Sequence, residues 1–401
     1  MRILLITQYF PPELGAAAQR IDSLARFLSK RAQVSVLAPI PSYPWGAIQK
    51  SVRSIGGSVE TNGVSVFRIY KSPHRRNFLL RLLGELLYAI LGLTSAWQLP
   101  KPDVVFISSP SFFLGMIGLV LKRLKKIDYV FDVRDYYPDS AVDAGVLREG
   151  LLYRLMKRLE RAIYTDATLV SVVLETWQSE IESSAKKVVV VPNGIDLDKF
   201  RGESSPLTDH LPPDKLTFLE NHFIVLYPGN LGKLQDNLTF LKVAGDLVRK
   251  GNNHIQFVFL GEGLEKENLM AWVRRENVSN CHFWDPVPSE AVPEIIRRAD
   301  IGIVGLKRHL RAYSGGVPSK VYEYLAGDLD VIACLEGDLP NDLLESGKFF
   351  VFDNTDIDGI VKKILDLKSA GEKSHTSGEL LEKMSRAKHF ERLWAVIQAR
   401  A

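Results

Sequence analysis

Several segments in the second half of the chain combine residue types that bind phosphate. The first runs Tyr227-Pro228-Gly229-Asn230-Leu231-Gly232-Lys233, the second is Gly261-Glu262-Gly263, and each follows a short apolar run. Glycines at the end of a strand leave backbone N–H groups open to an anion, and Lys233 adds a positive charge beside them. Both segments therefore favour contact with a phosphate group.

A third segment, Pro318-Ser319-Lys320, adds a second cation and a helix start. A helix that begins at Ser319 would direct its positive end and the Lys320 ammonium at one anionic group. Glu323 follows one turn later, where a carboxylate can accept two hydrogen bonds from a ribose diol. Each segment alone is also typical of an ordinary turn, but the three together predict a pocket for a nucleoside diphosphate.

The motifs of several other enzyme classes are missing. The chain has neither the glycine motif of a Rossmann dehydrogenase nor the P-loop motif of an NTPase, which disfavours both classes. Asp-x-Asp pairs occur at positions 196/198, 328/330 and 356/358. Two carboxylates in a loop are typical of turns and helix caps, so we expect no metal site and no metal cofactor.

Length and composition bound the fold class. The 401 residues predict two domains, and 46% hydrophobic with 24% charged residues excludes a disordered chain, a collagen or a coiled coil. Two cysteines, Cys281 and Cys334, are too few for a disulfide framework or a zinc site, which fits a reducing cytosol.

The charge is unevenly distributed along the chain. Residues 1–200 carry a net charge of +8 and residues 201–401 a net charge of −4. A basic half indicates an anionic partner, either nucleic acid or a membrane surface. Residues 79–97 favour the membrane, because an apolar helix follows Arg75-Arg76 and contains Tyr88 and Trp97. Lys122-Arg123-Leu124-Lys125-Lys126 forms a second basic cluster; a helix buried against a sheet is the alternative for residues 79–97.

Short apolar strands alternate with helical patterns through most of the chain. The N-terminal apolar run, residues 3–6, is too short for a secretory signal and is typical of a buried first strand. Expected strands are residues 2–7, 34–38, 104–108, 129–133, 169–173, 188–191, 223–227, 256–260, 281–284, 301–304, 331–334 and 349–352. Expected helices are residues 19–31, 79–97, 238–250, 264–276, 289–298 and 320–325.

Strands without polar alternation are buried on both faces, which predicts parallel sheets covered by helices. The series restarts after a polar stretch at residues 202–214. We therefore expect an α/β fold with two doubly wound, Rossmann-like domains that face each other across a cleft. The predicted boundaries are 1–200 for the first domain and 201–401 for the second, with the last helix packed back on the first.

Six motifs in order give the chain a resemblance to a known family. They are Phe10-Pro11-Pro12-Glu13-Leu14-Gly15, Asp132-Val133-Arg134-Asp135-Tyr136-Tyr137-Pro138-Asp139-Ser140, Val191-Pro192-Asn193-Gly194-Ile195-Asp196, Gly229-Asn230-Leu231-Gly232, Gly261-Glu262-Gly263 and Pro318-Ser319-Lys320-Val321-Tyr322-Glu323. In this order the chain resembles a GT-B glycosyltransferase of the large retaining family 4, nearest the subgroup that builds bacterial surface polysaccharides.

The resemblance implies retaining transfer of a sugar from a nucleotide-sugar, a UDP-sugar above all, to an acceptor hydroxyl on a lipid-linked saccharide. Asp135 is implied to orient or polarise that hydroxyl. The residues implied to bind the donor are Gly15, Gly229, Asn230, Gly232, Lys233, Gly261, Gly263, Val287, Ser319, Lys320 and Glu323. The enzyme would need no metal and no nucleic acid, and would lie in the cytoplasm on the inner face of the membrane.

The chain departs from the family pattern at several positions. Only the second of two paired glutamates, Glu323, is present, because Gly315 holds the place of the first. Arg134 stands where many members have a histidine, and Asn230 where a basic residue is common, so that Lys233 would have to serve. Two alternatives stay open: a nucleotide-sugar epimerase or hydrolase on the same scaffold, and a catalytically inactive nucleotide-sugar-binding subunit.

Overall fold

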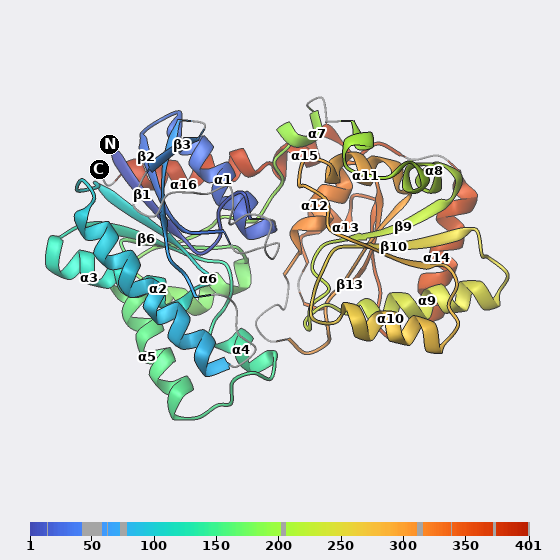
Figure 1. Ribbon diagram of the computed structural model, residues 1–401, viewed down its shortest axis with the longest axis horizontal. Helices are drawn as coiled ribbons and strands as arrows, with labels where there is room; N and C mark the ends of the chain where they lie inside the picture. Colours follow the sequence, from blue (N-terminus) through green and yellow to red (C-terminus); the bar gives the residue numbers. More distant parts are fainter. Residues whose placement is uncertain are drawn as a thin grey trace. The chain divides into compact units, whose positions relative to one another are not determined.

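The computed structural model describes residues 1–13, 15–41, 58–61, 63–72, 78–201, 206–310, 316–337, 339–371 and 374–399. The chain divides into two compact units (Figure 1): unit 1 is Met1–Asn193 with Arg386–Ala401, and unit 2 is Gly194–Ser385. Each unit is a sheet with helices on both faces, and all strands are parallel except one edge strand of unit 1, so the predicted fold class, two doubly wound α/β domains, is confirmed.

Unit 1 holds an eight-stranded sheet in the order β3-β4-β2-β1-β5-β6-β7-β8. Its strands are β1 (Arg2–Thr7), β2 (Gln33–Pro39), β3 (Ser58–Thr61), β4 (Val64–Ile69), β5 (Val104–Ser108), β6 (Asp128–Val133), β7 (Leu169–Val172) and β8 (Val188–Val190). Its helices are α1 (Ala16–Ser29), α2 (Phe78–Gln98), η1 (Phe112–Leu114), α3 (Gly115–Lys125), α4 (Asp139–Asp143), α5 (Leu151–Asp166), α6 (Glu175–Glu182) and α16 (Arg386–Gln398).

Unit 2 holds a six-stranded parallel sheet in the order β11-β10-β9-β12-β13-β14. Its strands are β9 (Phe223–Pro228), β10 (Ile255–Leu260), β11 (Cys281–Trp284), β12 (Ile301–Gly305), β13 (Asp330–Cys334) and β14 (Phe349–Val351). Its helices are α7 (Asp198–Arg201), η2 (Leu207–Asp209), α8 (Pro213–Asn221), α9 (Asn237–Arg249), α10 (Lys266–Arg275), α11 (Val292–Arg298), α12 (Ser319–Ala326), α13 (Asn341–Leu344), α14 (Ile357–Ala370) and α15 (Gly378–Lys383).

Burial on both faces explains why the central strands are continuous apolar runs. Every residue of β1 except Arg2 is buried, and so is every residue of β9 except Phe223. In unit 1, α2, α3 and α5 cover one face of the sheet, and α1 with α16 covers the other. In unit 2, α11 and α12 cover one face, and α9, α10 and α14 cover the other. Such two-sided burial is typical of parallel sheets.

The order of the strands fixes where a ligand can approach each unit. In unit 1 the direction of winding reverses between β1 and β5, and in unit 2 it reverses between β9 and β12. In doubly wound sheets ligands bind outside the carboxyl ends of the strands at such a reversal. The loops after these four strands are therefore the first place to look for a site.

Residues 58–69 were not recognised as strands in the sequence, and they make the first sheet mixed. β3 pairs antiparallel with β4, whereas wholly parallel sheets were predicted. Only positions 62 and 63 separate the two strands, and so short a connection joins antiparallel neighbours. In β4 buried Val64 and Val66 alternate with less buried neighbours, the pattern of a strand near a sheet edge.

The division between the units lies at 193/194, whereas the sequence analysis placed it at 200/201. Ile195 and Leu197 are buried in a hydrophobic cluster of unit 2, which assigns this stretch to the second unit. The last helix, α16, belongs to unit 1, where Phe390 and Leu393 pack in one cluster with Ile21 of α1.

Gly302 of β12 allows α12 to pack directly on the sheet. A Cβ atom here would lie 2.3 to 2.6 Å from ring atoms of Tyr324, whose hydroxyl donates to the carbonyls of Leu226 (3.1 Å) and Ile303 (2.9 Å). Because the Tyr324 ring is fixed by these bonds, Gly302→Ala should lower the free energy of unfolding by roughly 1–3 kcal/mol, the usual cost of overpacking.

Urea denaturation of Gly302→Ala beside Gly378→Ala tests this packing. Gly378 is the matched control, because no heavy atom lies within 4 Å of a Cβ at its exposed position in α15. The same unfolding midpoint for Gly302→Ala and the wild type would show that α12 is not held in this way.

Candidate active site

Two of the glycine segments predicted to bind phosphate pack directly against each other in unit 2. A Cβ at Gly261 would lie 2.1 Å from the carbonyl oxygen of Gly229, and one at Gly263 would lie 2.2 Å from that of Leu231. Gly229 and Gly261 also have φ angles of 140° and 150°, which residues other than glycine rarely adopt. The backbone amide of Leu231 donates to the carbonyl of Glu262 at 2.8 Å. Glycine is therefore required for the loops after β9 and β10 to meet.

Lys320 brings the third predicted segment to the same place. Its Nζ lies 3.7 Å from the centre of the Tyr227 ring and 3.3 Å from where a Cβ of Gly229 would be. Lys320 is in the first turn of α12, whose N-terminus has no side-chain cap. The two bonds of Tyr324 hold this helix against β9 and β12, on either side of the strand reversal. An ammonium and a helix N-terminus thus lie over the first glycine turn.

The remaining residues predicted for the donor in unit 2 differ in how exposed they are. Ser319 and Glu323 are half-buried in α12, and positions three and four residues apart share a helix face. Val287 is half-buried against the hydrophobic cluster of unit 2 that contains Trp284. Asn230 and Lys233 are exposed, and Lys233 forms no hydrogen bond or ion pair with any residue that the structure describes.

Two residues at this edge of the sheet were missed in the sequence. Lys266 is buried and pairs with Glu262 at 2.5 Å and with Asp285 at 3.1 Å, which ties the loop after β10 to the loop after β11. Gln235 accepts a hydrogen bond from the amide of Gly232 at 3.1 Å. The spacing of Glu262 and Lys266, four residues, is the only sequence signal for either contact.

In unit 1, a buried carboxylate fixes the carboxyl ends of three neighbouring strands. Asp132 at the end of β6 accepts hydrogen bonds from Ser108 of β5 (3.0 Å) and Ser171 of β7 (2.8 Å). Arg20 of α1 lies 3.5 Å from the same carboxylate and also donates to the carbonyls of Val191 and Pro192. A fully buried carboxylate needs such partners, so Asp132 anchors the loop that follows it.

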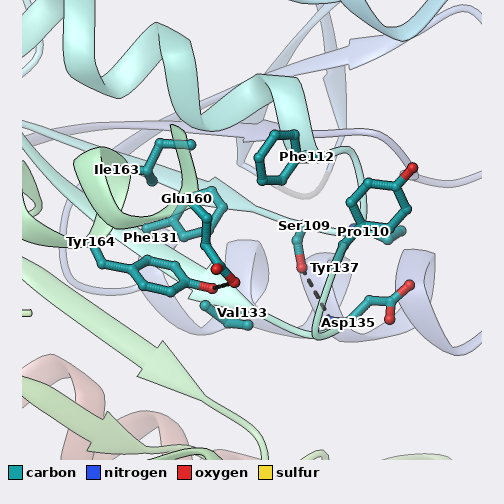
Figure 2. A pocket seen from close by; sticks show the side chains of 10 residues that line it. All are labelled: Ser109, Pro110, Phe112, Phe131, Val133, Asp135, Tyr137, Glu160, Ile163 and Tyr164. Atoms are coloured by element: carbon teal, nitrogen blue, oxygen red, sulfur yellow. Dashed lines mark hydrogen bonds between the residues drawn. The ribbon is translucent and has the colours of Figure 1, made fainter. Parts of the chain in front are cut away.

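Asp135 stands in that loop, one side of which lines a small pocket. The amides of Arg134 (2.8 Å) and Asp135 (3.3 Å) both donate to the hydroxyl of Ser109. The pocket leaves room for about one water molecule. Figure 2 shows Asp135 and Tyr137 on one side of it and Glu160 and Tyr164 on the other. The full lining is Ser109, Pro110, Phe112, Phe131, Val133, Asp135, Tyr137, Glu160, Ile163 and Tyr164.

Arg134 and Gly15 lie together at the start of α1. Arg134 donates to the carbonyl of Ala17 at 3.2 Å, and burial, followed by the neighbouring Arg20, lowers the pKa of Arg134 to about 9. Gly15 precedes the first residue of α1 with a φ of 116°, and no side chain caps this N-terminus. The start of α1 therefore combines uncapped backbone amides with a nearby guanidinium.

One aspartate in each of two Asp-x-Asp pairs forms local hydrogen bonds to the backbone. The Asp356 side chain accepts from the amide of Gly359 and caps α14, and Asp328 accepts from the amide of Thr376 at 2.7 Å. Across the described ranges, no three His, Cys, Asp or Glu side chains come together as metal ligands.

Comparison with known proteins places both units in described families. A glycosyl transferase 4-like domain matches residues 15–194, and a glycosyl transferases group 1 domain matches residues 212–384. The putative colanic acid biosynthesis glycosyl transferase WcaI of Escherichia coli (strain K12) is 24% identical over 337 residues, or 81% of each chain. The probable glycosyltransferase WbjE of Pseudomonas aeruginosa is 25% identical over 279 residues, or 67% of this chain and 66% of WbjE.

Solved structures match the fold over the whole chain. Sucrose-phosphate synthase from Thermosynechococcus elongatus superposes with a TM-score of 0.74 at 15% identity, and Anabaena HepE in complex with UDP-glucose with a TM-score of 0.71 at 13% identity; both matches cover all of each chain. With a transferase domain matched in each unit, the chain is a glycosyltransferase of the GT-B fold, built from a glycosyl transferase 4-like domain and a group 1 domain.

Proposed function

We propose that this glycosyltransferase moves a sugar from a UDP-sugar to a hydroxyl of a lipid-linked saccharide, with retention of configuration, in the synthesis of a surface polysaccharide. The observation that carries the proposal is the Lys320 ammonium over the Gly229 turn at the N-terminus of α12. The polysaccharide setting is supported by the printed name of WcaI, and the uridine donor by the UDP-glucose bound to HepE. Retention is what the family resemblance implies.

The positive groups fit a reaction in which a diphosphate leaves. Charge that develops on the leaving group is stabilised best by fixed donors that need no rearrangement. Lys320, the α12 N-terminus and the backbone of the Gly229 and Gly261 turns are fixed in this way by Tyr324 and by the glycine contacts. Protein groups alone would suffice for this charge, so we propose that no metal is required.

The other donor contacts follow from the positions of the half-buried residues. Glu323 would accept hydrogen bonds from the ribose hydroxyls, since it lies one turn beyond Lys320 on α12. The peptide at Pro286-Val287, after β11, would meet the base. Gly15 would contribute backbone amides from the uncapped start of α1, and Asp135 would orient the acceptor hydroxyl from the loop after β6.

An apolar stripe on α2 supports attachment to a membrane surface. Leu80, Leu83, Leu87, Ile90 and Trp97 are exposed at helical spacing, with Leu83 60% exposed. Among the described residues, α2 is the one helix long and apolar enough to cross a membrane by length and composition, and 28% of that stretch is buried. The sequence left a buried helix and a membrane-surface helix open; this half-exposed stripe favours the surface position.

Basic groups adjoin the stripe, and a second helix adds to it. Lys125 of the 122–126 cluster donates to the carbonyl of Trp97 at 2.8 Å, while Arg75 and Arg76 lie outside the described residues. On α5, exposed Leu151 and Leu155 alternate with arginines at 154, 158 and 161, and α2 and α5 share a small hydrophobic cluster. This face suits the inner, anionic leaflet of the cytoplasmic membrane, where we propose that the enzyme works.

Lys320→Ala should weaken UDP binding about 10- to 100-fold, because it removes a charge-assisted hydrogen bond to the diphosphate worth roughly 1.5–3 kcal/mol. Calorimetry with UDP measures the loss. Lys242→Ala is the matched control, since Lys242 is exposed on α9. An unchanged UDP affinity in folded Lys320→Ala would remove Lys320 from the donor site.

Asp135→Asn should lower the transfer rate about 10²-fold, the low end of the range for lost proton or hydroxyl activation, and leave UDP affinity unchanged. Asp135 belongs to unit 1 and Lys320 to unit 2, so the two effects should separate. Steady-state kinetics and UDP calorimetry on the same variant give both readouts. A matching fall in UDP affinity would assign Asp135 to the donor instead.

Binding to anionic vesicles should fall as salt is raised, since each Lys or Arg near the surface contributes about 1 kcal/mol and is screened over roughly a Debye length. Leu83→Ser should weaken the vesicle binding that persists at high salt. Leu264→Ser is the control and should leave this binding unchanged, because Leu264 is an exposed leucine of unit 2. Co-sedimentation measures both. Failure to bind anionic vesicles at low salt, or equal binding to neutral ones, would refute the proposed attachment.

A further inference from the structure

The face of α2 opposite the apolar stripe carries polar residues that the donor chemistry does not use. Arg81, Glu85 and Tyr88 follow one another at helical spacing on that face, and the fully buried Tyr88 hydroxyl donates to the carbonyl of Thr7 at 2.6 Å. Gly84 lies against Ser72, where a Cβ would be 3.1 Å from the Cβ of Ser72. This packing brings the residues after β4 to the same face of α2.

Four separate segments of unit 1 meet at this face. Lys71 lies after β4, with Nζ 5.1 Å from the centre of the Tyr9 ring, and Tyr9 lies after β1. Arg81 forms a side-chain hydrogen bond with Tyr137, in the loop after β6. Glu85 interacts electrostatically with Lys71, Arg81 and Asp135. Tyr137 and Asp135 line the same small pocket, so the cluster lies near Asp135 and takes side chains from both sides of the β1/β5 reversal.

An unsatisfied buried amide marks the same place. Gln8 is 3% exposed, and its Nε2 lies 3.3 Å from the Tyr9 hydroxyl. Its Oε1 has no hydrogen-bond partner among the residues that the structure describes. Buried polar atoms are nearly always paired, so this oxygen indicates a water or ligand donor at the cluster.

We propose that Lys71, Arg81, Glu85 and Tyr9 form, with Asp135, a binding site for the hydroxyl groups of the acceptor's sugar. This rests on the proposed function, which it deepens by naming the part of the acceptor that unit 1 recognises. A sugar hydroxyl both donates and accepts, so it can donate to Glu85 and accept from Lys71 or Arg81 at once. Tyrosine rings beside these groups offer apolar surface to the sugar's C–H faces.

The charges favour a neutral sugar over a phosphate. Three carboxylates, of Glu13, Glu85 and Asp135, interact with four cations, of Arg68, Lys71, Arg81 and Arg134, so these charges nearly balance without an anionic ligand. Burial raises the pKa of Glu85 and lowers that of Lys71 to about 8, so both groups are shifted toward their neutral forms. Desolvation of this kind costs least when the ligand is uncharged.

The two faces of α2 would then act on two parts of one substrate. The exposed leucines contact the membrane in which the lipid tail is embedded, and Arg81 with Glu85, on the other face, contacts the sugar. A single rigid helix would thus set the distance between the bilayer surface and the hydroxyl that Asp135 orients.

Saturation-transfer NMR tests the site without requiring turnover. The probes are octyl β-glucoside, octyl β-galactoside and octyl N-acetyl-β-glucosaminide below their micelle concentrations, with octyl phosphate as the anionic counterpart. We expect saturation of ring protons in at least one glycoside, and at least tenfold weaker binding of that glycoside to Glu85→Gln. Glu175→Gln is the matched control, because Glu175 is exposed at the start of α6.

Equal binding of the glycoside to Glu85→Gln and the wild type would overturn the proposal. So would octyl phosphate competing with the glycoside at this site, or the absence of binding by every glycoside. UDP calorimetry on the same samples keeps the two proposals apart. Failure of the wild type to bind UDP would refute the proposed UDP-sugar donor. Glu85→Gln should bind UDP as the wild type does, because the proposed site contacts the acceptor alone.

Discussion

The close approach of two glycine turns is the constraint on which the proposed donor site of unit 2 depends. The Gly229 and Gly261 turns meet with no room for a Cβ, so the backbone itself forms the surface at the ends of β9 and β10. Lys320 can reach this surface only because Tyr324 pins α12 to the carbonyls of Leu226 and Ile303. Main-chain packing therefore sets the position of a charge, which makes the proposed anion site rigid.

In unit 1, where we propose that the acceptor binds, a buried carboxylate organises the ends of the strands. Asp132 accepts hydrogen bonds from hydroxyls of β5 and β7 and pairs with the guanidinium of Arg20, at the ends of three strands. Its burial is costly unless all these partners are present, so the strand ends and the start of α1 are held as one block. The loop that contains Asp135 begins beside this block. The Ser109 hydroxyl holds the start of the loop by accepting hydrogen bonds from the amides of Arg134 and Asp135.

The sequence predicted best those strands and turns that can be recognised from a single short segment. Buried strands such as residues 2–7 and 104–108 have the predicted bounds, because an apolar run ended by polar residues can be recognised without knowledge of a distant partner. The glycine turns were found for the same reason. Lys233 was named as a phosphate ligand from its place in the chain; it is exposed in the structure, and its role in the donor site stays a prediction.

Contacts between distant segments could not be read in this way. Lys266 bridges two loops, and Glu85 interacts electrostatically with Lys71 and Asp135, which belong to other segments of unit 1. The sequence does not show whether Arg81 and Glu85 in this apolar helix face the protein or the solvent. The contacts of Tyr88 and Gly84, which fix the packing of α2, are seen only in the structure. The exposure of the leucines of α5 could not be predicted either. An amphipathic helix has the same spacing of apolar residues whether these are covered by the protein or exposed.

Acceptor-dependent release of UDP is the measurement that tests the central claim most directly. The purified enzyme is incubated with a panel of UDP-sugars, each with and without a membrane extract containing lipid-linked saccharides, and free UDP is followed over time. The account predicts release from one UDP-sugar that rises severalfold when the acceptor lipid is added. Release that ignores the acceptor would indicate a hydrolase, and UDP binding without any release would indicate an inactive binding subunit; either result would contradict the account.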